Sequence, residues 1–134
     1  MTAPIRNTTK RLSHGQIVIC LGCCCGRTDK GHPPVPVDLL KAEWKRRKLL
    51  KHVQLTIAGC IGPCDASNAV LVFLGDEPVW LGGLHLPEHY RALLDWAVSC
   101  QESSALQPLP RMLLPHRIEE RFRTAAAVEL AAAV

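Results

Sequence analysis

The sequence reads QIVICLGCCCG over residues 16–26, an apolar run followed at once by four cysteines. Isoleucine and valine fit a pleated strand, so residues 16–19 predict a β-strand that ends at about Cys20. A similar apolar run at residues 53–57 precedes Cys60 and Cys64. Neighbouring strand ends would bring both groups of cysteines to one edge of a sheet.

The pattern around these two runs predicts an α/β fold. Prolines at positions 33, 34 and 36 prevent a helix from beginning before about residue 36, and Leu40 and Trp44 then form an apolar stripe. Further strands are expected at residues 69–74 and 79–81, and a second helix near Pro87. This order, with a right-handed crossover, predicts a thioredoxin-like four-stranded mixed sheet with two covering helices and a C-terminal tail or helix.

Length and composition predict one domain with tails. We expect a disordered N-terminal tail at residues 1–14, a thioredoxin-like domain at residues 15–100 and a Pro-containing linker at residues 101–116. Residues 117–134 are rich in alanine, which predicts a C-terminal helix or tail.

Charge and hydropathy exclude several classes of function. The net charge of +4 comes mostly from the N-terminal tail, so the sequence lacks the footprint of a dedicated nucleic-acid binder. No run of 18 apolar residues is present, so we expect no membrane span. Clustered cysteines without an export signal indicate a protein of the reducing cytoplasm, where thiols bind metals or react.

The cysteines have the chemistry of an iron-sulfur site. Thiolates are soft ligands for iron, and a 2Fe-2S cluster takes four of them, two per iron. Such a cluster carries negative charge, so the surrounding loops must turn backbone N–H groups toward the sulfurs. Glycine allows a loop to fold that closely, and glycines flank both groups of cysteines.

The spacings Cys20-x4-Cys25 and Cys60-x3-Cys64 resemble those of thioredoxin-like 2Fe-2S ferredoxins, in particular the cluster-binding small subunit of complex I and of related dehydrogenases and hydrogenases. The resemblance covers about residues 16–99. It implies a 2Fe-2S cluster held by Cys20, Cys25, Cys60 and Cys64, and it favours a homodimer. The Cys-Cys-Cys-Gly loop is also similar to a small bacterial ferredoxin subgroup, which suggests a link to cobalamin and cobalt metabolism.

The sequence departs from that family in two places. Cys23 and Cys24 stand beside Cys25, so each is an alternative second ligand. The proline that usually follows the second pair is absent, and residues 67–69 read Ser-Asn-Ala instead.

Two other functions fit part of the pattern. Cys20 and Cys23 form a C-x-x-C after a strand, as in dithiol redox proteins, but the expected helix begins too far away to stabilise a thiolate. Four cysteines also suit a zinc-binding or metal-delivery protein, although zinc sites favour two-residue gaps.

We therefore expect an electron carrier rather than an enzyme, because no catalytic triad, phosphate loop or carboxylate pair is present. It would pass single electrons to or from a redox partner protein. The partner would dock near the basic helix, at Lys41, Lys45, Arg46, Arg47 and Lys48. A solvated basic face is the simpler explanation of that cluster. Cys100 is expected to be a buried core residue, and the pair His85 and His89 to lie at the surface.

Overall fold

A computed structural model describes residues 3–6, 12–120 and 122 of the chain. The main elements follow the predicted order of strand, helix, three strands and helix: β1 (Gly15–Cys20), α1 (Val37–Arg47), β2 (Val53–Ala58), β3 (Val70–Leu74), β4 (Glu77–Leu81) and α2 (Pro87–Ser103). Short 3-10 helices lie between or after them: η1 (Thr28–Lys30), η2 (Leu49–Lys51), η3 (Cys64–Ala66) and η4 (Arg111–His116). The predicted α/β class is confirmed, and the thioredoxin-like assignment within it stays a prediction.

The four strands form one mixed sheet in the order β2-β1-β3-β4. Strand β1 pairs in parallel with β2 and antiparallel with β3, and β3 and β4 form an antiparallel hairpin. The parallel register places Cys20 opposite Ala58. The carboxyl ends of β1 and β2 therefore meet at the same edge of the sheet.

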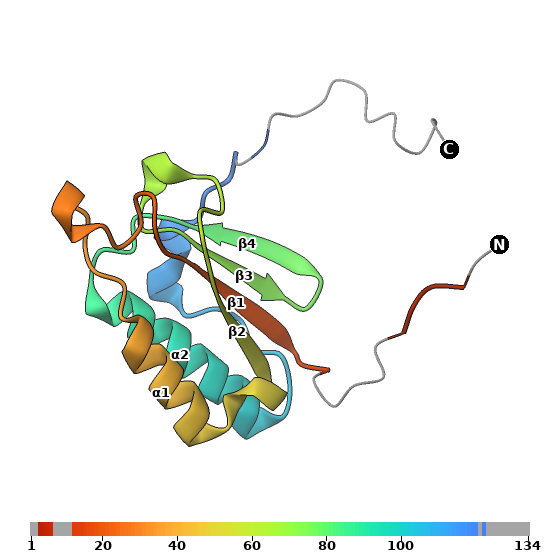
Figure 1. Cartoon of the computed structure of the whole chain (residues 1–134). Helices are drawn as coiled ribbons and strands as arrows, with labels where there is room; N and C mark the ends of the chain where they lie inside the picture. Colours follow the sequence, from red (N-terminus) through yellow and green to blue (C-terminus); the bar gives the residue numbers. More distant parts are fainter. Residues whose placement is uncertain (1–2, 7–11, 121, 123–134) are drawn as a thin grey trace, which may run out of the picture.

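Helices α1 and α2 lie side by side and cover one face of the sheet (Figure 1). Alternation along the strands turns Ile17, Ile19, Val70 and Val72 into the core, where each is fully buried. From α1, Trp44 packs into the same core and its indole N–H donates to the carbonyl oxygen of Val53 at 2.9 Å. This bond ties the crossover helix to the start of β2.

The segment after α2 is more integrated than its composition suggests. We predicted residues 101–116 as a linker, but α2 continues to Ser103 and the chain then folds back over the core. Leu113 is fully buried in η4, and the Trp96 indole N–H donates to the carbonyl oxygen of Gln107 at 2.7 Å. Prolines break the helical pattern here without preventing leucines between them from packing.

The chain then runs along the outer edge of β4. Arg117 bridges Leu81, and the Ile118 N–H donates to the carbonyl oxygen of Trp80 at 2.7 Å. Most of the predicted C-terminal helix or tail lies outside the described residues, as do positions 1–2 and 7–11 of the predicted N-terminal tail. Within the described part of the chain, no helix is long and apolar enough to cross a membrane.

Candidate cluster site at the cysteine loops

Two loops leave the same edge of the sheet from adjacent strands. The first cysteine loop, residues 20–26, follows β1, and the second cysteine loop, residues 59–64, follows β2. The Leu21 N–H donates to the carbonyl oxygen of Ala58 at 3.0 Å, so the ladder continues to the base of both loops. The structure thus places the loops side by side, at the upper left of Figure 1.

Cys20 and Cys25 form a buried pair inside the first cysteine loop. Their exposed fractions are 5% and 2%, and they pack with Ala69 and the half-buried Ile61. The Cys20 thiol is hydrogen-bonded to Cys25, and the Cys25 sulfur accepts a hydrogen bond from the Ala69 N–H at 3.3 Å. A backbone hydrogen bond from Ile61 is directed at Cys20. Each sulfur of the pair therefore already has a backbone donor.

Burial decides the protonation of Cys20. Desolvation raises the pKa of its thiol to about 12, with a further rise from the hydrogen bond to Cys25 and from the nearby charges of Cys25 and Cys60. The Ile61 N–H acts in the opposite direction, because it stabilises the thiolate. At neutral pH this thiol keeps its proton unless a bound metal displaces it.

The second cysteine loop carries the other two proposed ligands, Cys60 and Cys64. Cys60 is exposed, yet it lies close enough to act electrostatically on Cys20. Cys64 begins η3, and its side chain lies outside what the structure describes. No three of the described His, Cys, Asp or Glu side chains are arranged to hold a single metal ion. In a binuclear cluster each iron takes only two thiolates, so a paired arrangement is the relevant one.

The extra thiols of the first cysteine loop are more exposed than this pair. Cys23 is exposed and Cys24 half-buried, and the loop here is held by the Lys30 ammonium, which donates to the carbonyl oxygen of Cys23 at 3.0 Å. The pKa of Arg27 is raised, mainly by its ion pair with Asp29 and to a smaller extent by these two cysteines. Cys23 and Cys24 thus lie on the outer, basic side of the loop.

Cys100 lies apart from the site, fully buried within α2. Its pKa is raised by burial. It packs in the main core cluster, whereas Cys20 and Cys25 form a cluster of their own. This placement is the core role expected from the sequence.

The sequence did not reveal the role of Asn68, which is fully buried and joins the end of the first cysteine loop to the fold. Its side-chain oxygen accepts the Gly26 N–H at 2.8 Å, and its amide donates to the carbonyl oxygen of Pro33 at 2.9 Å. Its backbone oxygen accepts the Leu84 N–H at 3.1 Å. The Ser-Asn-Ala sequence in place of the expected proline was the one signal that pointed to this position.

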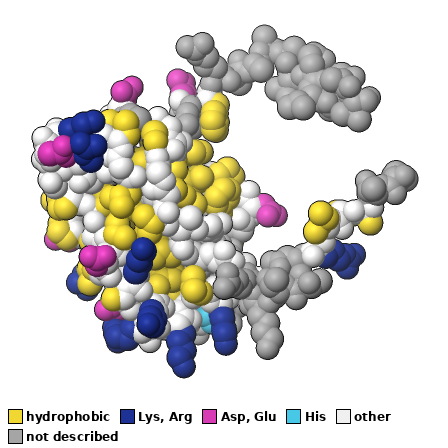
Figure 2. All heavy atoms as spheres, in the orientation of Figure 1, with side chains coloured by type: hydrophobic (Ala, Val, Ile, Leu, Met, Phe, Trp, Pro, Cys, Tyr) yellow, Lys and Arg dark blue, Asp and Glu magenta, His cyan; other side chains and the backbone are white. Residues whose placement is uncertain are grey.

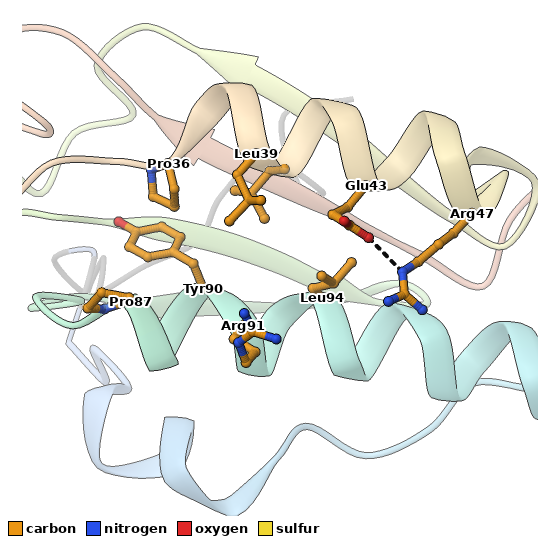
Figure 3. Close-up of a pocket in the computed structure, with 9 residues that line it drawn as sticks. Pro36, Leu39, Glu43, Arg47, Pro87, Tyr90, Arg91 and Leu94 are labelled. Atoms are coloured by element: carbon orange, nitrogen blue, oxygen red, sulfur yellow. Dashed lines mark hydrogen bonds and ion pairs between the residues drawn. The ribbon is translucent and has the colours of Figure 1, made fainter.

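Tyr90 was assigned from the sequence only to the apolar stripe of α2. Its side chain is buried, and its hydroxyl lies near the Asn68 amide, a donor, but makes no hydrogen bond of standard geometry among the described residues, so its proton has no acceptor there. Burial raises the pKa of the phenol, the nearby Asn68 amide lowers it, and the charges of Cys25 and Cys20 raise it further. Figure 3 shows the hydroxyl pointing away from α2 toward Pro36, at the start of α1. A buried hydroxyl without an acceptor is costly, so an acceptor supplied by a bound group would explain it.

Taken together, the residues fit a sulfur-rich anionic group. Two backbone donors are directed at cysteine sulfurs, one buried hydroxyl lacks an acceptor, and a third thiol lies on the facing loop. When bound, a 2Fe-2S cluster would supply one-electron chemistry at this edge.

Comparison with known proteins does not name a family. A scan against models of protein families gives no match, and a search of curated proteins gives none either. The proposals below therefore rest on the residues and their geometry.

Proposed function

We propose that the protein is a 2Fe-2S electron carrier of the thioredoxin-like ferredoxin type, with Cys20, Cys25, Cys60 and Cys64 as ligands. The observation that carries this proposal is the buried pair Cys20 and Cys25, whose sulfurs receive backbone N–H groups from Ala69 and Ile61. Backbone donors of this kind stabilise the negative charge that a cluster places on its sulfurs.

The same geometry disfavours the dithiol redox function weighed from the sequence. A dithiol redox protein needs a thiolate stabilised near a helix N-terminus, but the pKa of Cys20 is raised to about 12 and α1 begins only at Val37. The alternative, a cysteine-based metal-binding or metal-delivery protein, would use the same thiols, so analysis of metal and sulfide separates the two.

The reducing cytoplasm suits such a carrier, because its thiols must stay reduced until they bind iron. We propose single electrons as its cargo and a redox partner protein as its recipient. A pairing of two chains and a role in cobalamin or cobalt metabolism stay part of this proposal.

The proposed docking face is the surface of α1 and α2. The lower edge of Figure 2, where α1 ends, gathers Lys and Arg side chains. Glu43 accepts bonds from Arg46 at 2.7 Å and from Arg47 at 2.8 Å, so one carboxylate is shared by two guanidinium groups. The helix keeps a positive excess, which favours an acidic partner surface.

An apolar groove between the helices extends this basic face toward the cysteine loops (Figure 3). Leu39 is 53% exposed on one wall, Arg91 lies on the other, and Pro36 and Pro87 stand at the end nearest the site. Lys45, Arg46 and Arg47 lie in the last turn of α1, roughly 12–15 Å from its start. They are therefore placed to steer an acidic partner along the groove rather than to touch the cluster.

The test of the cluster is analysis of protein purified without air. We expect about two irons and two acid-labile sulfides per chain, with visible absorption that bleaches on reduction. A colourless protein holding one zinc per chain and no sulfide would overturn the proposal in favour of the metal-binding alternative.

The docking face is tested separately in the loaded protein by reversing Lys45, Arg46 and Lys48 to Glu. Electron transfer with the cognate reductase should slow at low salt, and the difference should fade as screening shortens to ~8 Å near physiological ionic strength. The spectrum should not change. An unaltered rate would remove this face from the docking surface.

A further inference from the structure

Two histidines around the start of α2 and a third at the end of η4 form a cluster. The His89 ring lies 4.3 Å from the His116 ring and 5.1 Å from the His85 ring, measured between ring centroids. The sequence prediction of a surface pair is wrong for His89, which is only 4% exposed. The segment around η4 covers it, and this fold-back could not be read from the spacing of histidines 85 and 89.

Backbone contacts fix which nitrogen of each ring carries a proton. The Nδ1 atoms of His85 and His116 lie 2.8 and 2.9 Å from the carbonyl oxygens of Gly83 and Gly82, so both must donate. His89 is the reverse case, because its Nδ1 accepts the Leu86 N–H at 3.1 Å. That bond caps the first turn of α2.

We propose that His89 is an acid-sensitive latch that holds the η4 segment and the start of α2 together while its ring is neutral. Protonation of Nδ1 places an N–H against the Leu86 N–H and removes the cap. It also places a positive charge in the first turn of α2, where the helix dipole is unfavourable to cations. The latch stands apart from the proposed cluster, because among the described residues His89 contacts Leu86, His85 and His116 and not a cysteine.

All but one of the groups around His89 lower the pKa of its ring. The pKa of His89 is lowered by burial and by the neighbouring charges of His116 from η4 and His85 from the loop before α2. Glu88, an acidic neighbour in the first turn of α2, raises the pKa by a smaller amount. The closed state therefore binds the proton less readily than the open state, whose pKa is near 6.5.

The sign of the pH effect follows from this order of pKa values. Above pH ~6.5 both states are neutral and the latch is at full strength. As the pH falls from there toward the lower pKa of the closed state, opening becomes more favourable. The equilibrium constant for opening rises in total by about tenfold for each unit that separates the two pKa values. Below the pKa of the closed state this constant does not change further.

Opening the latch releases contacts that reach the proposed site. The Gly82 N–H donates to the carbonyl oxygen of His116 at 2.9 Å, and the Gly83 N–H donates to that of Ala66 at 2.9 Å. Ala66 ends η3, directly after the second cysteine loop. Acid should therefore loosen residues 82–90 and 111–118 first. Because Gly83 is hydrogen-bonded to Ala66, η3 should loosen with them.

Histidine NMR of the full chain gives the first test. The Cε1 proton of His89 should titrate below pH 6.5. Titration of His89 at or above pH 6.5 would overturn the latch.

Hydrogen exchange at pH 5 and pH 7.5, corrected for intrinsic rates, gives the second test. His89→Gln keeps an acceptor at the same helix position but has no proton to gain, so the acid-induced rise in exchange at residues 82–90 and 111–118 should vanish. His52→Gln is the matched control and should retain the rise. An acid response that survives His89→Gln contradicts the proposal, and the NMR titration decides it if that variant does not fold.

Discussion

The two cysteine loops leave adjacent parallel strands at the same edge but are held in different ways. In the first loop Cys20 and Cys25 are buried and hydrogen-bonded, and the backbone closes on itself through the Gly22 N–H and the carbonyl oxygen of Cys25 at 3.0 Å. In the second loop Gly59 and Cys60 are exposed. The fold thus builds one half of the proposed site and presents the other half to solvent.

This difference suggests different tolerances to substitution. The first loop contains two spare thiols, whereas the second contains none beyond the proposed ligands. The largest effect should therefore come from the second loop, and smaller ones from the spare thiols and from the residues that support them.

Cys60→Ser should abolish retention of the cluster. Loss of residues that only support a metal ligand weakens binding by about 10- to 100-fold, so loss of the ligand itself should exceed about 100-fold. Iron content and visible absorption measure this effect. The matched control is Cys23→Ser, since Cys23 is also exposed but is not one of the proposed ligands; a colourless Cys23→Ser protein with a coloured Cys60→Ser protein would reverse the ligand assignment.

The sequence predicted the order of the elements along the chain and the meeting of the loops for a simple reason. Both follow from short-range patterns: β-branched runs, turn residues and the handedness of a crossover. The contacts of Asn68 and Tyr90 could not be predicted, because they join residues far apart in the chain. The Gly26 N–H and the Asn68 side chain are 42 positions apart, and no local pattern encodes that pairing.

The fold-back after α2 was missed for a related reason. Proline composition indicates where helices stop, but it does not indicate whether the leucines between prolines find a core. Leu109 and Leu113 do, and with them His116 reaches His89.

Cys25→Ser should have a milder effect than Cys60→Ser. Cys24 is adjacent in the first loop and half-buried, so a small shift of the loop would offer its sulfur in place of the lost one. We expect altered absorption and electron paramagnetic resonance with part of the iron retained. The double variant Cys24→Ser with Cys25→Ser should then lose the cluster; equal loss in the single and double variants would show that the spare thiol does not substitute.

Asn68→Ala should weaken the whole domain and loosen the first loop before it affects ligand chemistry. The substitution leaves the Gly26 N–H and the Pro33 carbonyl oxygen without their buried partner, which costs roughly 2–4 kcal/mol in the free energy of unfolding. Denaturant unfolding of iron-free protein measures it. Gln16→Ala, which removes an exposed side-chain bond to Thr56, should change stability by no more than about 0.5 kcal/mol; similar losses in both variants would contradict the anchoring role.

Tyr90→Phe should produce the smallest effect and the most specific one. The hydroxyl is buried without an acceptor for its proton among the described residues and lies within electrostatic reach of Cys25 and Cys20, both in the first loop. In iron-free protein its removal should leave stability unchanged or slightly higher, because an unsatisfied buried group is lost.

In loaded protein a hydroxyl that donates to sulfur stabilises the reduced state, which carries more negative charge. A hydrogen bond of about 1.4 kcal/mol changes the reduction equilibrium about tenfold, so Tyr90→Phe should lower the potential by up to about 59 mV for one electron. Spectroelectrochemistry of both proteins measures the shift, and an unchanged potential would mean that the first loop is tuned by its backbone donors alone.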